Sequence, residues 1–201
     1  VAVTNGTAFT PPVGIHTFTY SVTNAATCTN TDDVVVTVNA LPVVNAGADQ
    51  TVCEGEAVTL SGNPAAGTWT GPVTIADGVA FTPPAGIHTF TYSVTNVAGC
   101  TVTNDVIVTV NALPSVNAGT DQTVCAGTAV TLNGTVAGGT WSGPVAVTNG
   151  TAFTPPAGVH TFTYSVTNGF GCTSTDNVIV TVNALPVVNA GVDQTICVGA
   201  S

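Results

Sequence analysis

The sequence predicts an all-β chain of tandem β-sandwich domains, and three observations carry this prediction. A block of 72 residues recurs along the 201-residue chain without insertion or deletion. Within each block, apolar and polar residues alternate with a period of two, which is typical of half-buried strands. Gly, Pro and Asn gather between the alternating runs, as turns require.

The repeat is visible from the first residue. VAVTNGTAFTPPVG begins at Val1, VTIADGVAFTPPAG at Val73 and VAVTNGTAFTPPAG at Val145, each 72 residues after the last. The motif NALP begins at Asn39, Asn111 and Asn183 and reads as a linker. We therefore expect two complete domains, 41–112 and 113–184. Residues 1–40 would be the C-terminal part of a preceding domain, and residues 185–201 the first strand or strands of a following one.

Short strands are expected in the first half of each domain. AVTLSG (57–62) points Val58 and Leu60 to one face, and GTWTG (67–71) and VAFT (79–82) add two short strands. Thr and Val suit a pleated, half-buried surface.

Two longer strands are expected in the second half. HTFTYSVTN (88–96) alternates strictly, and DVIVTVN (105–111) places three valines on one face. Short strands at even spacing with turns between them predict a β-sandwich or barrel. The candidate core aromatics are Trp69, Trp141, Tyr20, Tyr92, Tyr164, Phe90 and Phe162.

The positions of Trp69 and Tyr92, on the expected third and sixth strands, are those at which immunoglobulin-like sandwiches often place a core Trp and Tyr. NAGADQTVCEGEAVTLSG (45–62), with the two longer strands, resembles the PKD-like and related immunoglobulin-like repeats of large bacterial surface proteins. The cysteine pattern is similar to versions in secreted, repeat-rich proteins of Bacteroidota-type bacteria. This resemblance covers the whole chain and implies seven-stranded sandwiches strung head to tail in adhesins, stalks and filaments.

The composition excludes several functions. The chain has no Lys or Arg, ten acidic residues and a formal net charge of −10. Binding to nucleic acid depends on Lys and Arg that neutralise phosphates, and docking to anionic lipid depends on them too. The apolar runs are strand-sized, so no transmembrane helix is expected. We expect no nucleic acid, membrane insertion or small-molecule substrate.

Six cysteines, two in each 72-residue block, are expected to form disulfides in an extracellular protein. They are Cys28, Cys53, Cys100, Cys125, Cys172 and Cys197. Pairing within a domain would give Cys53–Cys100 and Cys125–Cys172. Geometry favours another pairing, because Cys53 and Cys100 fall at opposite poles of one sandwich, roughly 30 Å apart, whereas disulfide Cα atoms lie within about 7 Å. In a head-to-tail array Cys53 would instead face Cys172, and the other cysteines would pair with neighbouring repeats or subunits.

The two ends of the chain have complementary sequences. Residues 185–201 match the start of a domain, and residues 1–40 match the end of one. Two interpretations stand: a window on a long continuous polypeptide, or a filament in which the C-terminal segment of one subunit completes the N-terminal part of the next by strand addition.

Candidate chemistry is sparse. His16, His88 and His160 recur at one structural position, which favours packing or a turn hydrogen bond over catalysis. The carboxylates form no DxDxD-like cluster, so solvation or turn capping is the favoured role, and no cofactor is expected. If calcium binds, the place to look is between domains, around Asp49 or Asp121.

The leading hypothesis is a non-catalytic, extracellular fibre or stalk whose partners are copies of itself or adjacent repeats, head to tail. The alternative is the spacer of a cell-surface adhesin that presents a ligand-binding tip. A carbohydrate-binding accessory module is weaker, because aromatic residues make up only 6% of the chain and fall mostly at positions that read as core.

Overall fold

The computed structural model describes residues 3–199 and divides the chain into two compact units, Val1–Asn111 and Ala112–Ser201. The described residues form strands and turns and contain no helix. The prediction of an all-β chain is therefore confirmed. No helix among residues 3–199 is long and apolar enough to cross a membrane.

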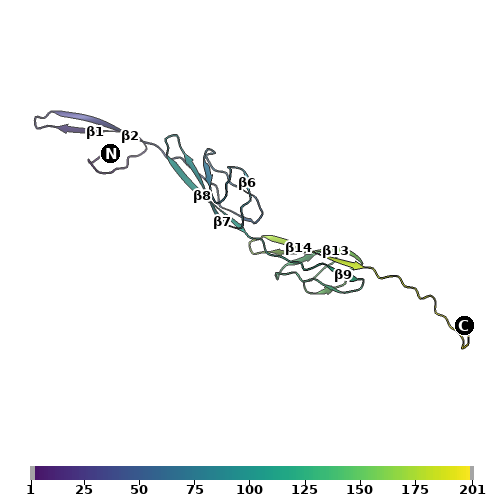
Figure 1. Ribbon diagram of the computed structural model, residues 1–201. Helices are drawn as coiled ribbons and strands as arrows, with labels where there is room; N and C mark the ends of the chain where they lie inside the picture. Colours follow the sequence, from purple (N-terminus) through teal and green to yellow (C-terminus); the bar gives the residue numbers. More distant parts are fainter. Residues whose placement is uncertain (1–2, 200–201) are drawn as a thin grey trace. The chain divides into compact units, whose positions relative to one another are not determined.

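The first unit holds one sandwich and one separate hairpin (Figure 1). In the sandwich, a four-stranded sheet has the order β3-β8-β7-β5, and a two-stranded sheet pairs β4 with β6. The bounds are Gln50–Cys53 for β3, Val58–Thr59 for β4, Thr68–Thr70 for β5, Ala80–Phe81 for β6, Gly86–Thr95 for β7 and Thr101–Asn111 for β8. The hairpin consists of β1 (Gly14–Thr23) and β2 (Thr29–Val38).

The second unit repeats this sandwich with every strand 72 residues further along. Its four-stranded sheet has the order β11-β13-β14-β9, and β10 pairs with β12. The bounds are Gln122–Cys125 for β9, Val130–Thr131 for β10, Thr140–Ser142 for β11, Ala152–Phe153 for β12, Gly158–Thr167 for β13 and Thr173–Asn183 for β14. Residues 184–199 follow without a strand.

Alternation along the long strands builds the cores. On β7, Phe90 and Tyr92 are fully buried and Val94 is 5% exposed, while the intervening threonines and serine lie on the other face. The valines of β8 at 106, 108 and 110 complete this layer, and Val58 and Leu60 cover it. The second core repeats the same residue types 72 positions later.

Two expectations require correction. Each unit's sandwich has six strands rather than the seven that the resemblance implies, because the segment before β3 forms only an isolated bridge between Asn45 and Asn63. Tyr92 accordingly lies on the fifth strand of its sandwich and not on the sixth. Trp69 does lie on the third strand, half-buried against the core.

The first and last strands of each sandwich are direct neighbours. β3 pairs in parallel with β8, with Gln50 opposite Val108 and Cys53 opposite Asn111. β9 and β14 pair in the same way in the second unit. Two long-range hydrogen bonds extend this contact upstream of β3: Ile107 N donates to Asp49 Oδ1 at 2.8 Å, and Ala46 N donates to Asn104 Oδ1 at 2.8 Å.

Candidate functional site

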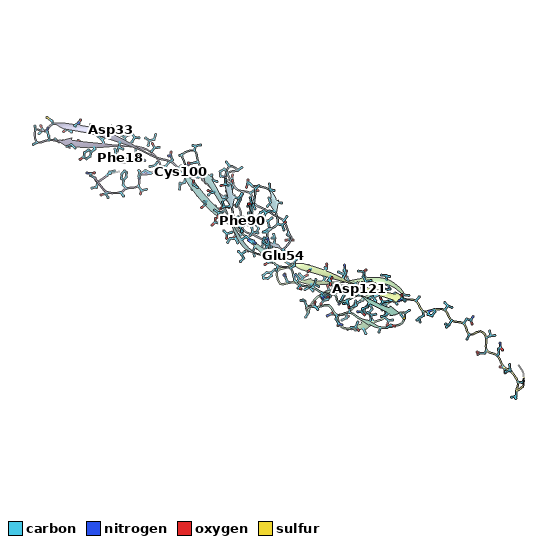
Figure 2. The ribbon with its side chains drawn as sticks, viewed as in Figure 1. Phe18, Asp33, Glu54, Phe90, Cys100 and Asp121 are labelled. Carbon is cyan, nitrogen blue, oxygen red and sulfur yellow. The ribbon has the colours of Figure 1, made fainter. Side chains whose placement is uncertain are left out.

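The two cysteines of one sandwich lie at opposite ends of its last strand. Cys53 is opposite Asn111 at the end of β8, whereas Cys100 immediately precedes Thr101 at its start. These ends are about 30 Å apart at ~3.3 Å per residue. Figure 2 labels Cys100 and Glu54, the neighbour of Cys53, at the two ends of the sandwich. A disulfide needs Cα atoms within about 7 Å, so Cys53 and Cys100 cannot pair in this fold.

The cysteines also differ in oxidation state. Cys53 and Cys172 are disulfide-bonded. Cys28, Cys100, Cys125 and Cys197 are free thiols, exposed except for the half-buried Cys100. The within-domain pairs Cys53–Cys100 and Cys125–Cys172 are therefore wrong for this structure, because each would need a cysteine that is free.

A glycine-rich segment covers the buried tyrosine of each sandwich. In the first unit, Tyr92 Oη donates to the Pro64 carbonyl at 2.6 Å and accepts from Gly67 N at 2.9 Å, while the Trp69 ring lies 4.7 Å from the Tyr92 ring. Tyr164 Oη donates to the Val136 carbonyl at 2.8 Å in the second unit. The segment between β4 and β5 therefore holds the phenol from above.

Three glycines let this segment approach the aromatic rings. A Cβ on Gly62 or Gly67 would overlap the Tyr92 ring, and one on Gly71 would overlap the Phe90 ring. The same overlaps occur at Gly134, Gly139 and Gly143. None of these six glycines has a positive φ, so what excludes a side chain is the aromatic surface and not the backbone. The repeated glycine spacing in the sequence could have revealed this cover, but sequence reasoning missed it.

Hairpin β1–β2 has the same strand sequence as the sandwich hairpins but not their cover. Tyr20 is 62% exposed, Val22 53% and Val34 57%, whereas Tyr92, Val94 and Val106 are at most 5% exposed. Tyr20 is therefore not a core residue, contrary to expectation, because no segment equivalent to β3–β5 lies over it among residues 3–199.

The open face of this hairpin is hollowed. A hollow of about 390 Å³ is lined by Val3, Asn5, Phe18, Thr19, Tyr20 and Val34. Phe9 partly fills its neighbourhood, with its ring centre 5.0 Å from that of Phe18. Figure 2 shows Phe18 on this thin hairpin and Phe90 within the body of the sandwich. The hairpin thus presents an apolar face and an unpaired edge on β2.

The histidines share one structural hydrogen bond. His16, His88 and His160 each hold a proline carbonyl four residues upstream with Nε2, at 2.7, 2.8 and 2.7 Å. A carbonyl can only accept, so Nε2 carries the proton in each copy. This bond closes the turn before each long strand and occupies the ring nitrogen.

Several carboxylates cap backbone groups. Asp49 and Asp121 accept from Ile107 N and Ile179 N, Asp176 accepts from Ala118 N, and Glu56 accepts from Cys53 N, all at 2.8 Å. Within residues 3–199, no group of three or more His, Cys, Asp or Glu side chains could hold a metal ion. The suggested calcium ligands Asp49 and Asp121 therefore act here as backbone acceptors within their own units.

The acceptor beneath each tryptophan differs between the units. Asp77 Oδ1 accepts from Trp69 Nε1 at 2.9 Å and from Gly62 N at 2.6 Å, whereas Asn149 Oδ1 accepts from Trp141 Nε1 at 3.0 Å and from Gly134 N at 2.7 Å. A hollow of about 360 Å³ borders Trp141 and Asn149. The indole N–H there is already engaged, so this hollow offers little polar recognition.

No protein-family model and no curated protein matches the chain. Among solved structures it is similar to an endo-fucoidan hydrolase from glycoside hydrolase family 107, with a TM-score of 0.30 and 12% sequence identity. The match covers 87% of this chain and 35% of the hydrolase, so the chain spans about a third of that protein. A TM-score this low carries no argument about fold or activity.

Proposed function

We propose that the chain is a structural stretch of an extracellular fibre or stalk, built from immunoglobulin-like domains joined head to tail, with 41–112 and 113–184 as complete domains. The observation that carries the proposal is the oxidised state of Cys53 and Cys172, because neither can bond to the other cysteine of its own sandwich. A Cys53–Cys172 disulfide would staple successive domains together.

The order of the strands supports a load-bearing role. The chain runs from Asn45 to Cys53 alongside β8 and leaves each sandwich at the far end of that strand. Tension applied at the two ends of a domain would load these parallel contacts together, in shear, rather than one after another. Resistance to pulling is what a fibre requires of each module.

The chemistry of the repeated positions also supports the proposal. The histidines, the aspartates before β3 and β9, and the buried tyrosines make the same hydrogen bonds in successive copies. Carboxylates and imidazoles are occupied by turn and strand contacts. The repeated arrangement therefore supplies regular modules, as a fibre or spacer needs.

Electron microscopy of the native material tests this function. We expect regular filaments that survive in non-reducing buffer and lose stiffness after treatment with a thiol reductant. Isolated flexible rods that end in a distinct ligand-binding tip would favour the adhesin spacer instead. Compact single particles would contradict both.

A further inference from the structure

Hairpin β1–β2 and the C-terminal segment 185–199 have complementary unfilled surfaces. We propose that residues 185–199 of one copy of this chain add as a strand to β2 of a second copy, and that two interchain disulfides close the joint. Cys125 of the first copy would bond to Cys28 of the second, and Cys197 to Cys100. This inference rests on the proposed head-to-tail fibre and names the partner of its terminal surfaces.

The C-terminal segment carries the sequence that docks in both complete sandwiches. VNAGVDQTIC (188–197) matches VNAGADQTVC (44–53) and VNAGTDQTVC (116–125). It already forms the same local turn, since Gly191 N donates to Asn189 Oδ1 at 2.8 Å, as Gly47 N does to Asn45 Oδ1. It nevertheless forms no strand, and Ile196 is 69% exposed where the equivalent Val52 is half-buried.

The acceptor edge is vacant in the hairpin. In the sandwich, Val108–Asn111 pairs with Gln50–Cys53, and the equivalent stretch 36–39 of the hairpin has no partner on that side. Strand addition to an open sheet edge is an established mode of recognition, in which backbone hydrogen bonds give affinity and alternate side chains give specificity.

Polar groups on the two surfaces match as well. The docked segments are held by Ala46 N to Asn104, Ala118 N to Asp176, Ile107 N to Asp49 and Ile179 N to Asp121. The equivalent groups across the joint are Ala190 N with Asp32 and Val35 N with Asp193. Both donors and both acceptors of this reciprocal arrangement are therefore present.

The cysteine spacing pairs all four free thiols. Cys53 and Cys172 are 172 − 53 = 119 residues apart. The same geometric step from Cys125 leads to the cysteine of the hairpin that the C-terminal segment completes, which is Cys28 of the second copy. From Cys197 it leads to the next sandwich of that copy, at Cys100. All four thiols are free in the isolated chain, and three are exposed.

Each new bond is a two-electron oxidation. Two thiols exchange with a low-molecular-weight disulfide, so that one protein disulfide forms and two small thiols leave with the protons. Covalent closure matters because residues 185–199 lack the glycine-rich cover, and Tyr20 would remain without the cap that holds Tyr92. We therefore expect weak association under reducing conditions and stable polymers after oxidation.

The test is oxidation of the whole chain with a glutathione redox buffer, followed by light scattering and digestion with endoproteinase Asp-N and chymotrypsin without reduction. These proteases place the cysteines in separate fragments: 21–31, 49–69, 93–104, 121–141, 171–175 and 193–201. We expect polymers in which 121–141 is linked to 21–31 and 193–201 to 93–104. A persistent monomer, or random cysteine pairs, would overturn the inference. A Cys28–Cys125 link within a monomer would overturn the second copy as partner.

A matched pair of substitutions separates strand docking from chance thiol collisions. Ile196→Asp puts a carboxylate at the core-facing position of the added strand and should lower the yield of correctly linked polymer about tenfold or more. Val198→Asp makes the same change where the first repeat has Glu54, and should leave the yield unchanged. Both positions lie outside any strand, so neither change affects folding of the free chain. Equal yields would contradict docking. Detection of Cys53–Cys172 without any interchain link would overturn this joint alone and leave the proposed fibre standing.

Discussion

The Trp69 indole donates a hydrogen bond of 2.9 Å to Asp77 Oδ1, and this carboxylate also accepts from Gly62 N. One side chain thus ties the third strand of the sandwich to the turn that covers Tyr92. The Gly62 N–H, followed by the Trp69 N–H, lowers the pKa of Asp77 from its usual value of 3.8. The second sandwich has Asn149 at this place, which makes the same two bonds without titrating.

This difference predicts that the first sandwich is the more acid-labile. Because the folded-state pKa of Asp77 is depressed, its stabilisation is present above pH 3.8 and is lost as pH falls through the folded value. Thermal melts followed by tryptophan fluorescence in Trp141→Phe and Trp69→Phe backgrounds report each sandwich separately. Between neutral pH and about pH 2–3, the melting temperature of the first sandwich should fall further than that of the second.

Asp77→Asn is the matched control for this effect, since it copies the second sandwich. The variant should remove the excess acid sensitivity of the first sandwich. A variant that remains as acid-labile as the parent would show that Asp77 is not its source.

The phenol of Tyr92 should contribute to stability, unlike that of Tyr20. Tyr92→Phe leaves the Pro64 carbonyl and Gly67 N without their partner, and should lower the free energy of unfolding of the first sandwich by about 1–3 kcal/mol. Tyr20→Phe, at an exposed ring, should change it by about 0.5 kcal/mol or less. Urea denaturation measures both, and equal effects would contradict the clamped tyrosine.

The glycine cover predicts a purely steric penalty. Gly71→Ala places a methyl group into the Phe90 ring and should destabilise the sandwich by about 1–3 kcal/mol or more. Gly169→Ala, which meets nothing within 4 Å, should be close to neutral. Denaturant midpoints of the two variants test the prediction, and a neutral Gly71→Ala would mean that the segment does not pack on the ring.

The sequence predicted the long strands well because their burial follows from strict alternation. Phe90, Tyr92 and Val94 were assigned to one face of a strand, and they are buried on β7. The opposite-pole placement of Cys53 and Cys100 also followed from strand counting. The exposed state of Tyr20 could not be predicted from its own repeat, because burial depends on a covering segment and not on the strand that carries the ring. The Trp69–Asp77 bond was missed for a similar reason: it joins two loops whose approach is set by tertiary packing.

The contact between first and last strands predicts a mechanical effect of Asp49. Asp49→Ala removes the acceptor of Ile107 N and should lower the free energy of unfolding by about 1 kcal/mol, together with the unfolding force of the first sandwich in single-molecule pulling. Asp105→Ala, an exposed carboxylate on β8 itself, should change neither. Equal unfolding forces for the two variants would argue against shear loading of this contact.

The most direct test of the stapled array is a disulfide map of the untreated protein, digested with endoproteinase Asp-N and chymotrypsin without reduction. A linked pair of fragments 49–69 and 171–175 is the predicted product, since Cys53 and Cys172 carry the disulfide-bonded sulfurs. Recovery of 49–69 joined to 93–104 would show that each domain closes on itself, and the proposal of cross-linked successive domains would fail.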